Sequence, residues 1–302
     1  RSLERKEAIF TWPAVSEAEC ASLLQSMKVP TEYRLQQVQK AMWAGSSIAE
    51  VFEATKIDPW YLRQIELINQ QASIIAQPGE LTPELLRTAK SQGFSDSQIA
   101  SLRGVSEDEI RKARHHFGVR PVYKTVDTCA AEFEAFTPYH YSSYEEETEV
   151  RPRTTPAVII LGSGPNRIGQ GIEFDYSCVH ASFTLRDAGY ETIMINCNPE
   201  TVSTDYDTSN RLYFEPLTLE DVLEVVHAET LAGPVLGVIT QLCGQTPLGL
   251  AAGLKANGVT ILGTSPDSIN LAEERGAFGN ILAEQGLRAP EFGMASSQLE
   301  AT

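Results

Sequence analysis

The chain has 302 residues, of which 42% are hydrophobic and 21% charged, values typical of a soluble protein of about two domains. No apolar run reaches the length of a membrane span and the N-terminal RSLERKEAIF lacks a signal-peptide core, so we expect a cytoplasmic protein and no membrane partner. The net charge of −16 is uneven: residues 1–125 hold 16 basic and 15 acidic residues, the remainder 8 and 25, and neither part has the basic footprint of a nucleic-acid binder.

Cysteine and histidine positions argue against a metal or disulfide framework. The five cysteines are scattered and form no CxxC pair, which favours reduced thiols in a cytosol. His115 and His116 are adjacent, and adjacent residues do not share a helix face. We therefore predict no metal site.

Residues 1–124 are predicted to form an all-helical domain. Thr31 is expected to cap a helix that ends at Gly45, and Asp58 and Thr82, each followed by proline, to cap two more. Two short helices follow within residues 94–117, and no strand is predicted before residue 120.

Residues 125–155 change in character. They contain three tyrosines and two phenylalanines, an acidic run and the stretch RPRTTP. We expect a long connector, ordered by its aromatic side chains where it crosses a neighbouring surface. The alternative is a flexible linker, although linkers rarely carry so many rings.

Residues 156–274 alternate between apolar strands and amphipathic helices. This alternation, with continuous apolar strands, predicts a parallel α/β sheet. The expected strands are AVIILG, ETIMINC, RLYF, VLGVIT and VTILG, with helices over 174–189, 218–229, 246–258 and from Ser265-Pro266 onward.

The stretch GSGPNRIGQG after the first of these strands raises the question of nucleotide binding. Gly162 and Gly164 fit the first two positions of the dinucleotide fingerprint, but Arg167 stands where the third glycine belongs. A phosphate loop also fails, because Gln170 replaces the lysine. The glycines therefore indicate a backbone shape more than a dinucleotide site.

Polar side chains follow the predicted strands at their carboxyl ends, where open α/β sheets place ligands. Carboxylates and amides that converge on one edge could bind a small polar substrate or line a water-filled passage. The alternative, for single residues such as Asp175 and Thr246, is that they only cap helices. The residues expected at this substrate edge are Asn166, Arg167, Gln170, Asn198, Gln245 and Thr246, together with Glu173 and Glu200.

The stretches GSGPNRIGQGIEFDY, INCNPETVSTDYDTSNRLYFEPLTLEDVLEVV and CGQTPL resemble the second half of the carbamoyl phosphate synthetase large subunit. DPWYLRQIE and YKTVDTCAAEF resemble the oligomerisation domain and connector of the same polypeptide. The resemblance covers essentially the whole chain. It implies an all-helical oligomerisation domain (1–124), a connector (125–155), a Rossmann-like parallel α/β pre-ATP-grasp domain (156–274) and the start of a truncated ATP-grasp domain (275–302).

The resemblance also implies roles for single residues. Arg275 matches an arginine that contacts ATP, and a guanidinium suits a phosphate oxygen. Glu173 and Glu200 match carboxylates that line an interior passage for carbamate. Gln245 and Thr246 match the family's G-G-Q-T, but Cys243 replaces its first glycine, so a positive φ is not expected there.

At the level of the whole enzyme, the resemblance implies synthesis of carbamoyl phosphate from bicarbonate, glutamine-derived ammonia and two ATP, for pyrimidine and arginine biosynthesis. It implies ATP with Mg²⁺ or Mn²⁺ and K⁺ as cofactors, none held tightly by this piece. The implied partners are the other large-subunit domains, a glutaminase small subunit and further copies bound through the helical domain. By itself this piece is expected to have no catalytic residues.

Two other functions compete with this interpretation. Residues 94–117 have the pattern of a helix-turn-helix, with Arg111, Lys112, Arg114 and His115 on its second helix, which would suit nucleic acid or assembly. A NAD-dependent oxidoreductase is the other, and Arg167 opposes it.

Overall fold

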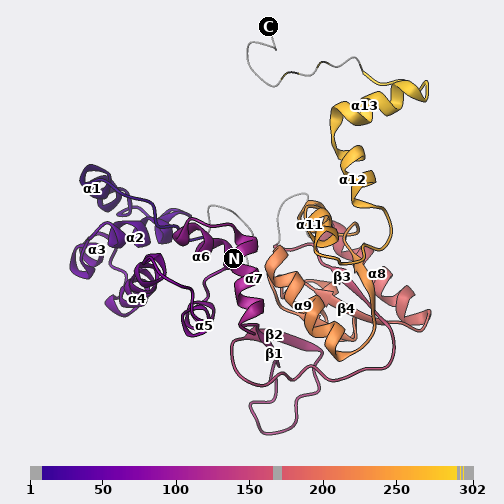
Figure 1. Ribbon diagram of the computed structural model, residues 1–302, viewed down its shortest axis with the longest axis horizontal. Coiled ribbons are helices and arrows are strands. Elements are labelled where there is room, and N and C mark those ends of the chain that lie inside the picture. Colours follow the sequence, from indigo (N-terminus) through magenta and orange to yellow (C-terminus); the bar gives the residue numbers. More distant parts are fainter. Residues whose placement is uncertain (1–8, 166–171, 291–292, 294, 296–302) are drawn as a thin grey trace.

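The structure is a computed structural model that describes residues 9–165, 172–290, 293 and 295. A bundle of helices forms one part and an α/β unit the other (Figure 1), which agrees with the predicted fold class. The helices of the bundle are α1 (Glu17–Ser26), α2 (Arg34–Trp43), α3 (Ile48–Thr55), α4 (Pro59–Ala76), α5 (Pro83–Ser91), α6 (Asp96–Arg103) and α7 (Glu107–His116).

Side-chain caps fix most of these helix starts. The Asp58 carboxylate accepts from Trp60 N at 2.8 Å and begins α4, and Thr82 caps α5 in the same way, as predicted. The predicted Thr31 cap is wrong. α2 begins at Arg34, whose N–H donates to the Thr31 carbonyl at 3.1 Å, so residues 31–33 form a turn before the helix.

The bundle has two small cores that share α4. The first packs Met27, Val38, Val51 and Leu62 among α1–α4, and the second packs residues of α4–α7 such as Leu86. Because α4 contributes a face to both cores, it ties the two halves of the bundle together.

The α/β unit is built on a six-stranded sheet in the order β1-β2-β5-β4-β3-β6. All neighbouring strands are parallel except β1 and β2. The four strands β5-β4-β3-β6 have the order of half a dinucleotide-binding fold. The strands are β1 (Val122–Thr125), β2 (Tyr139–Ser143), β3 (Ala157–Leu161), β4 (Glu191–Ile195), β5 (Arg211–Tyr213) and β6 (Val235–Ile239).

Strands β1 and β2 were not predicted. β2 pairs with β5 through Tyr139–Leu212 and His140–Tyr213, so residues before the apolar β3 extend the sheet. The pairing was missed because these strands are short and polar, and their burial comes from the sheet that they join.

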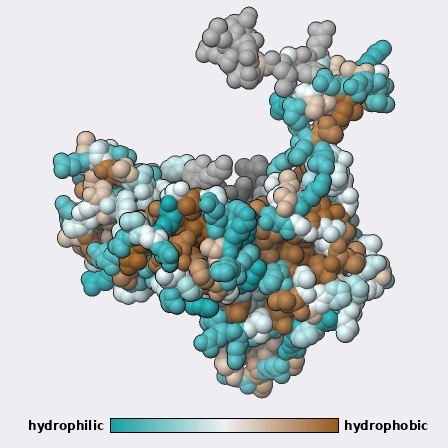
Figure 2. Space-filling model, viewed as in Figure 1, coloured by the Kyte–Doolittle hydropathy of each residue, from teal (hydrophilic) through white to brown (hydrophobic). Residues whose placement is uncertain are grey.

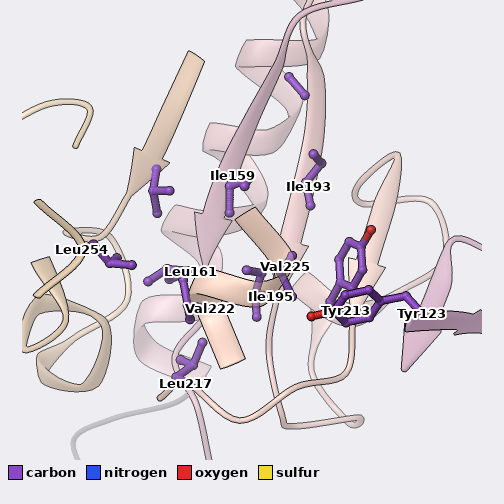
Figure 3. Close-up of a cluster of buried hydrophobic side chains, with 12 residues drawn as sticks. Tyr123, Ile159, Leu161, Ile193, Ile195, Tyr213, Leu217, Val222, Val225 and Leu254 are labelled. Carbon is purple, nitrogen blue, oxygen red and sulfur yellow. The ribbon is translucent and has the colours of Figure 1, made fainter. Parts of the chain in front are cut away.

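Helices cover both faces of the sheet. Ile159, Leu161, Ile193 and Ile195 face α9 (Leu219–Ala232) and Leu254 of α11 (Ala251–Ala256), which form the core in Figure 3. The alternate side chains Ile160 and Met194 face α8 (Ile172–Asp187). The sheet is therefore buried on both sides, as its continuous apolar strands indicate.

Two predicted elements after β6 differ from the structure. The strand expected at 259–263 is a single bridge, Val238 to Ile261. The helix expected over 246–258 breaks at Gly249 into α10 (Gln245–Leu248) and α11. Gly253 permits a close approach of α11 to α9, since a Cβ there would lie 3.1 Å from a Leu219 methyl.

The last helices extend from the α/β unit. Ser265 and Pro266 begin α12 (Pro266–Glu273) as predicted, and α13 (Arg275–Glu284) follows it. Both helices project from the body of the molecule (Figures 1 and 2), and this segment exposes Leu271, Phe278 and Leu287.

The bundle is joined to α9 by buried charges. Lys90 of α5 donates to Glu220, and the Asp96 N–H donates to the same carboxylate at 2.9 Å. Arg114 of α7 forms a bidentate pair with Asp96, both distances 2.8 Å, and reaches Glu224 at 3.1 Å. Paired charges of this kind hold two surfaces in one register.

Glu224 is the centre of this joint. Its carboxylate also lies 2.8 Å from His115 Nε2 and 2.7 Å from Arg120 Nη1. Burial opposes its ionisation, but the hydrogen bond with His115 and the charges of Arg114 and Arg120 prevail and lower the pKa of Glu224 to about 2.

Candidate functional site

The carboxyl edge of the sheet gathers loops from three neighbouring strands. β3 lies between β4 and β6, and the loops that follow these strands all emerge at the same edge. The segment after β3 leads to α8 on one face of the sheet, and the segment after β6 leads to α10 and α11 on the other face. This edge is therefore the switch point at which open α/β sheets bind ligands.

Gly162 and Gly164 shape the loop after β3 around an asparagine. A Cβ on Gly162 would lie 2.6 Å from the Asn196 side chain, so only glycine fits there. Gly164 has φ +76 and donates its N–H to Asn196 Oδ1 at 3.1 Å. The glycines thus accommodate a buried amide, which supports the prediction that they serve backbone shape.

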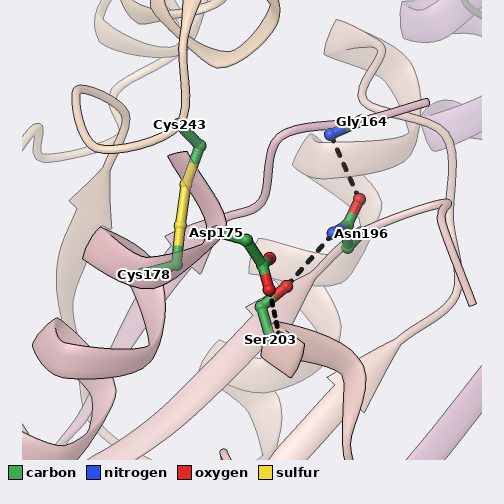
Figure 4. The surroundings of a disulfide bond; sticks show 6 residues. All are labelled: Gly164, Asp175, Cys178, Asn196, Ser203 and Cys243. Atoms are coloured by element: carbon green, nitrogen blue, oxygen red, sulfur yellow. Dashed lines mark hydrogen bonds between the residues drawn. A yellow bond between two sulfur atoms is a disulfide. The ribbon is translucent and has the colours of Figure 1, made fainter. Parts of the chain in front are cut away.

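Asn196 and Asp175 connect this loop to the next one (Figure 4). Asn196, at the end of β4, donates to Ser203 Oγ at 3.3 Å. Asp175, on the first turn of α8, accepts from Ser203 N at 2.8 Å. Asp175 is 1% exposed and both Asn196 and Ser203 are fully buried, so the network is sealed from solvent.

A disulfide bond between Cys178 and Cys243 corrects the prediction of reduced thiols. Cys178 lies on α8 and Cys243 in the loop after β6, so the bond ties this helix to the third loop of the edge. No local pattern indicated this bond, because 65 positions separate the two residues. Both are fully buried, which separates the bond from dissolved thiols.

Four of the predicted site residues lie on these loops. Asn198 is half-buried after β4, and its Oδ1 accepts from the N–H of Glu200 at 3.0 Å, while the Glu200 side chain is exposed. Gln245 and Thr246 begin α10, directly after Gly244, which takes φ +82 in place of Cys243. Four others cannot be placed in this way: Asn166, Arg167 and Gln170, as well as the side chain of Glu173 on α8, lie outside the described part of the chain.

Arg275 belongs to α13, which projects away from the α/β unit (Figure 1). It is exposed at the first position of α13. Glu274 caps that helix by accepting from Gly276 N at 3.0 Å and from Ala277 N, so these N–H groups are already paired. The backbone hydrogen bonds to Ala277 and Gly276 lower the pKa of Glu274. For a nucleotide, the exposed guanidinium of Arg275 could supply a phosphate contact.

The helix-turn-helix alternative loses its basic face. Arg114 is fully buried against Asp96 and Glu224, and His115 contacts Glu224. Arg111 is buried and pairs with Asp108 at 2.6 Å, which leaves Lys112 as the exposed cation of the four. Arg114 and His115, which suggested a nucleic-acid site in the sequence, therefore hold the bundle against α9.

Within the described ranges, no group of three or more His, Cys, Asp or Glu side chains is arranged to hold a metal ion. In the same ranges, no helix is both long and apolar enough to cross a membrane. A hollow of about 690 Å³ lies beside the domain joint, lined by residues that include Arg120, Tyr144 and His227, and not at the carboxyl edge of the sheet.

The hydrogen bonds that assemble the edge were not predicted from the sequence. Asp175 was expected either among the polar residues of this edge or as a helix cap, and Ser203 was not singled out, whereas the two bind each other across 28 positions. A possible signal was the density of small polar residues in NPETVSTD, which favours side-chain and backbone hydrogen bonds.

Sequence comparisons assign both parts of the chain. The profile of the carbamoyl-phosphate synthetase large chain oligomerisation domain matches residues 1–118. The profile of the carbamoyl phosphate synthase preATP-grasp domain matches residues 154–271. The two profiles are consecutive on one chain, which agrees with the bundle and the α/β unit.

Curated relatives agree with these matches. The carbamoyl phosphate synthase large chain of Streptomyces avermitilis is 65% identical over 297 residues, which is 98% of this chain and 27% of that protein. The large chain of Kineococcus radiotolerans gives the same identity and coverage, and that of Kocuria rhizophila is 61% identical over 306 residues. The chain thus spans about a quarter of the length of the relatives that it matches.

Proposed function

Because the chain belongs to the family of carbamoyl phosphate synthase large chains, we propose that it supplies the oligomerisation domain and the pre-ATP-grasp domain of the carbamate-phosphorylating half of such an enzyme. The complete enzyme would make carbamoyl phosphate from bicarbonate, glutamine-derived ammonia and two ATP, as an ATP-dependent ligase that serves pyrimidine and arginine biosynthesis in the cytoplasm. The observation that carries the proposal is that two consecutive domains of this family occur on one chain, joined by the buried charges around Glu224.

The carboxyl edge of the sheet would form a wall of the carbamate passage. Glu200 stands on a loop that is anchored to α8, the helix whose second residue is Glu173. Carboxylates and amides can guide a small polar molecule by hydrogen bonds while the sealed network beneath them excludes bulk water. We assign Glu173 and Glu200 to the passage. The substrate edge would comprise Asn166, Arg167, Gln170, Asn198, Gln245 and Thr246.

Arg275 would contribute to ATP binding from the edge of a neighbouring domain. A fixed guanidinium binds phosphate oxygens well, and Arg275 is exposed on a projecting segment. Residues 275–302 would belong to the start of the ATP-grasp domain, and the exposed Leu271, Phe278 and Leu287 would pack against its remainder. ATP with Mg²⁺ or Mn²⁺, and K⁺, would bind in the complete enzyme, where the rest of the nucleotide site would be supplied.

Formation of ATP from ADP and carbamoyl phosphate tests this assignment. The complete large chain should catalyse it, the 302-residue chain by itself should not, and Arg275→Ala in the complete chain should reduce it. A folded complete chain without this activity would refute the proposal.

The helical bundle would also bind further copies of the enzyme. Trp60, Leu67 and Ile74 of α4 recur every seven positions and are 61%, 51% and 48% exposed, so they form an apolar strip on one face. Leu67→Glu should lower the oligomer mass measured by light scattering. Leu231→Glu, at a leucine of α9 that is 77% exposed, serves as the control and should leave that mass unchanged. Equal masses for all three proteins would contradict a role for α4.

Other partners follow from the same proposal. They are the remaining large-chain domains and a glutaminase small chain, with no nucleic acid and no membrane among them.

A further inference from the structure

We infer that Asp175 is a positioning residue, which sets the place of the loop that carries Glu200 relative to the helix that carries Glu173. The inference rests on the proposed function, because it assumes that these two glutamates line one passage.

The position of Asp175 gives it this role. It is the fourth residue of α8, two after Glu173, and its side chain is 1% exposed. Its Oδ2 accepts from the N–H of Ser203, which lies three residues after Glu200 in the short turn Val202–Thr204. One hydrogen bond of 2.8 Å therefore connects the two short segments on which both glutamates stand.

The contact cannot be dismissed as a generic cap. A capping side chain satisfies an N–H group of its own helix, whereas Asp175 accepts from a loop 28 positions further along the chain. Its other oxygen, Oδ1, is buried and accepts no hydrogen bond from any residue that the structure describes. Burying a carboxylate with one oxygen unpaired among these residues costs free energy. The hydrogen bond from Ser203 N offsets part of that cost.

The surrounding contacts make the loop position depend on this bond. Ser203 Oγ accepts from Asn196, and Asn196 Oδ1 accepts from Gly164 (Figure 4). Asn196 Oδ1 also accepts weakly from Asn198 at 3.4 Å, and Asn198 in turn holds the N–H of Glu200. A shift of the turn at Ser203 would thus move both the Glu200 loop and the loop after β3.

The consequence is a prediction about coupling. If the wall of the passage moves, carbamate would escape to solvent and hydrolyse, so more ATP would be consumed for each carbamoyl phosphate formed. The formation of ATP from ADP and carbamoyl phosphate needs no transfer through the passage and would stay unchanged. A residue with a merely structural role would lower both activities together.

The test uses the complete large chain with ammonia as nitrogen source. Asp175→Ala should raise the ATP consumed per carbamoyl phosphate several-fold, because carbamate would be lost before it is phosphorylated. Asp175→Asn keeps an acceptor for Ser203 N and should restore most of the coupling. Asp207→Asn, an exposed aspartate on the same loop, is the control. If Asp175→Ala does not fold, Ser203→Pro removes the N–H that Asp175 accepts, and Ser203→Ala, which removes only the hydroxyl that accepts from Asn196, is its matched control.

Each outcome separates the inference from the proposed function. Uncoupling by Asp175→Ala with an unchanged partial reaction supports the inference. Proportional loss of both activities, or uncoupling by Glu200→Ala but not by Asp175→Ala, overturns it and leaves the passage in place. If neither variant uncouples, the passage assignment itself fails, and the role of Asp175 fails with it.

Discussion

Removing the charge of Glu224 should destabilise the chain markedly, because this carboxylate joins the helical bundle to α9. Its side chain is 4% exposed, and it contacts Arg114, His115 and Arg120. The pKa falls from an ordinary 4.5 to about 2 in the folded protein. Since a tenfold change in proton affinity corresponds to about 1.4 kcal/mol, ionised Glu224 contributes about 3 kcal/mol.

Glu224→Gln is the variant that tests this value. If the chain unfolds as one unit, an unfolding entropy of about 2 cal/mol/K per residue over 302 residues gives a fall in melting temperature of about 5 °C. The measurement is thermal unfolding followed by circular dichroism at pH 7. Glu53→Gln, at an exposed glutamate paired with Lys56, is the matched control and should change the melting temperature little.

The pH dependence gives the prediction its sign. A carboxyl whose pKa is lower in the folded state stabilises the protein above its unfolded pKa, near 4.5, and loses that effect as the pH falls through about 2. The difference between the parent chain and Glu224→Gln should therefore shrink from pH 5 to pH 2.5. A difference that stays constant over this range, or a loss no larger than that of Glu53→Gln, would refute the reasoning.

Three further changes test other parts of the structure. Reduction under denaturing conditions should raise the thiol count by two, and an unchanged count would contradict the disulfide. Cys178→Ser should lower the free energy of unfolding by about 4 kcal/mol, because the bond to Cys243 closes a loop of 65 positions. Gly162→Ala should cost about 1–3 kcal/mol in denaturant unfolding because its Cβ would overlap Asn196, and a neutral result would mean that this amide moves aside easily. In the complete large chain, Arg275→Ala should raise the KM for ADP in ATP formation from carbamoyl phosphate, since one phosphate contact is removed, and an unaltered KM would argue against its role.

The local pattern of the sequence was enough to predict most individual elements. Asp58-Pro59, Thr82-Pro83 and Ser265-Pro266 each begin a helix in the structure, because a cap and a proline act within one turn of chain. The apolar runs that form β3 and β4 were predicted as buried strands because both faces of a parallel strand are covered. The family resemblance, carried by long motifs, was confirmed by both domain profiles.

Contacts between distant residues were decided only by the tertiary structure. Arg114 and His115 have the spacing of a nucleic-acid face, yet α9 supplies Glu224 opposite them, more than one hundred positions away. β2 becomes a strand because β5 offers it hydrogen-bond partners, which its own polar residues do not predict.

The candidate site divides in the same way. The sequence by itself indicated which strand ends carry polar residues, because the carboxyl ends of parallel strands share one edge. It did not indicate that Asp175 binds Ser203 or that Cys178 bonds Cys243, since pairing depends on how loops fold back over α8. Local chemistry fixes the elements of this protein, whereas long-range packing decides which of their side chains meet.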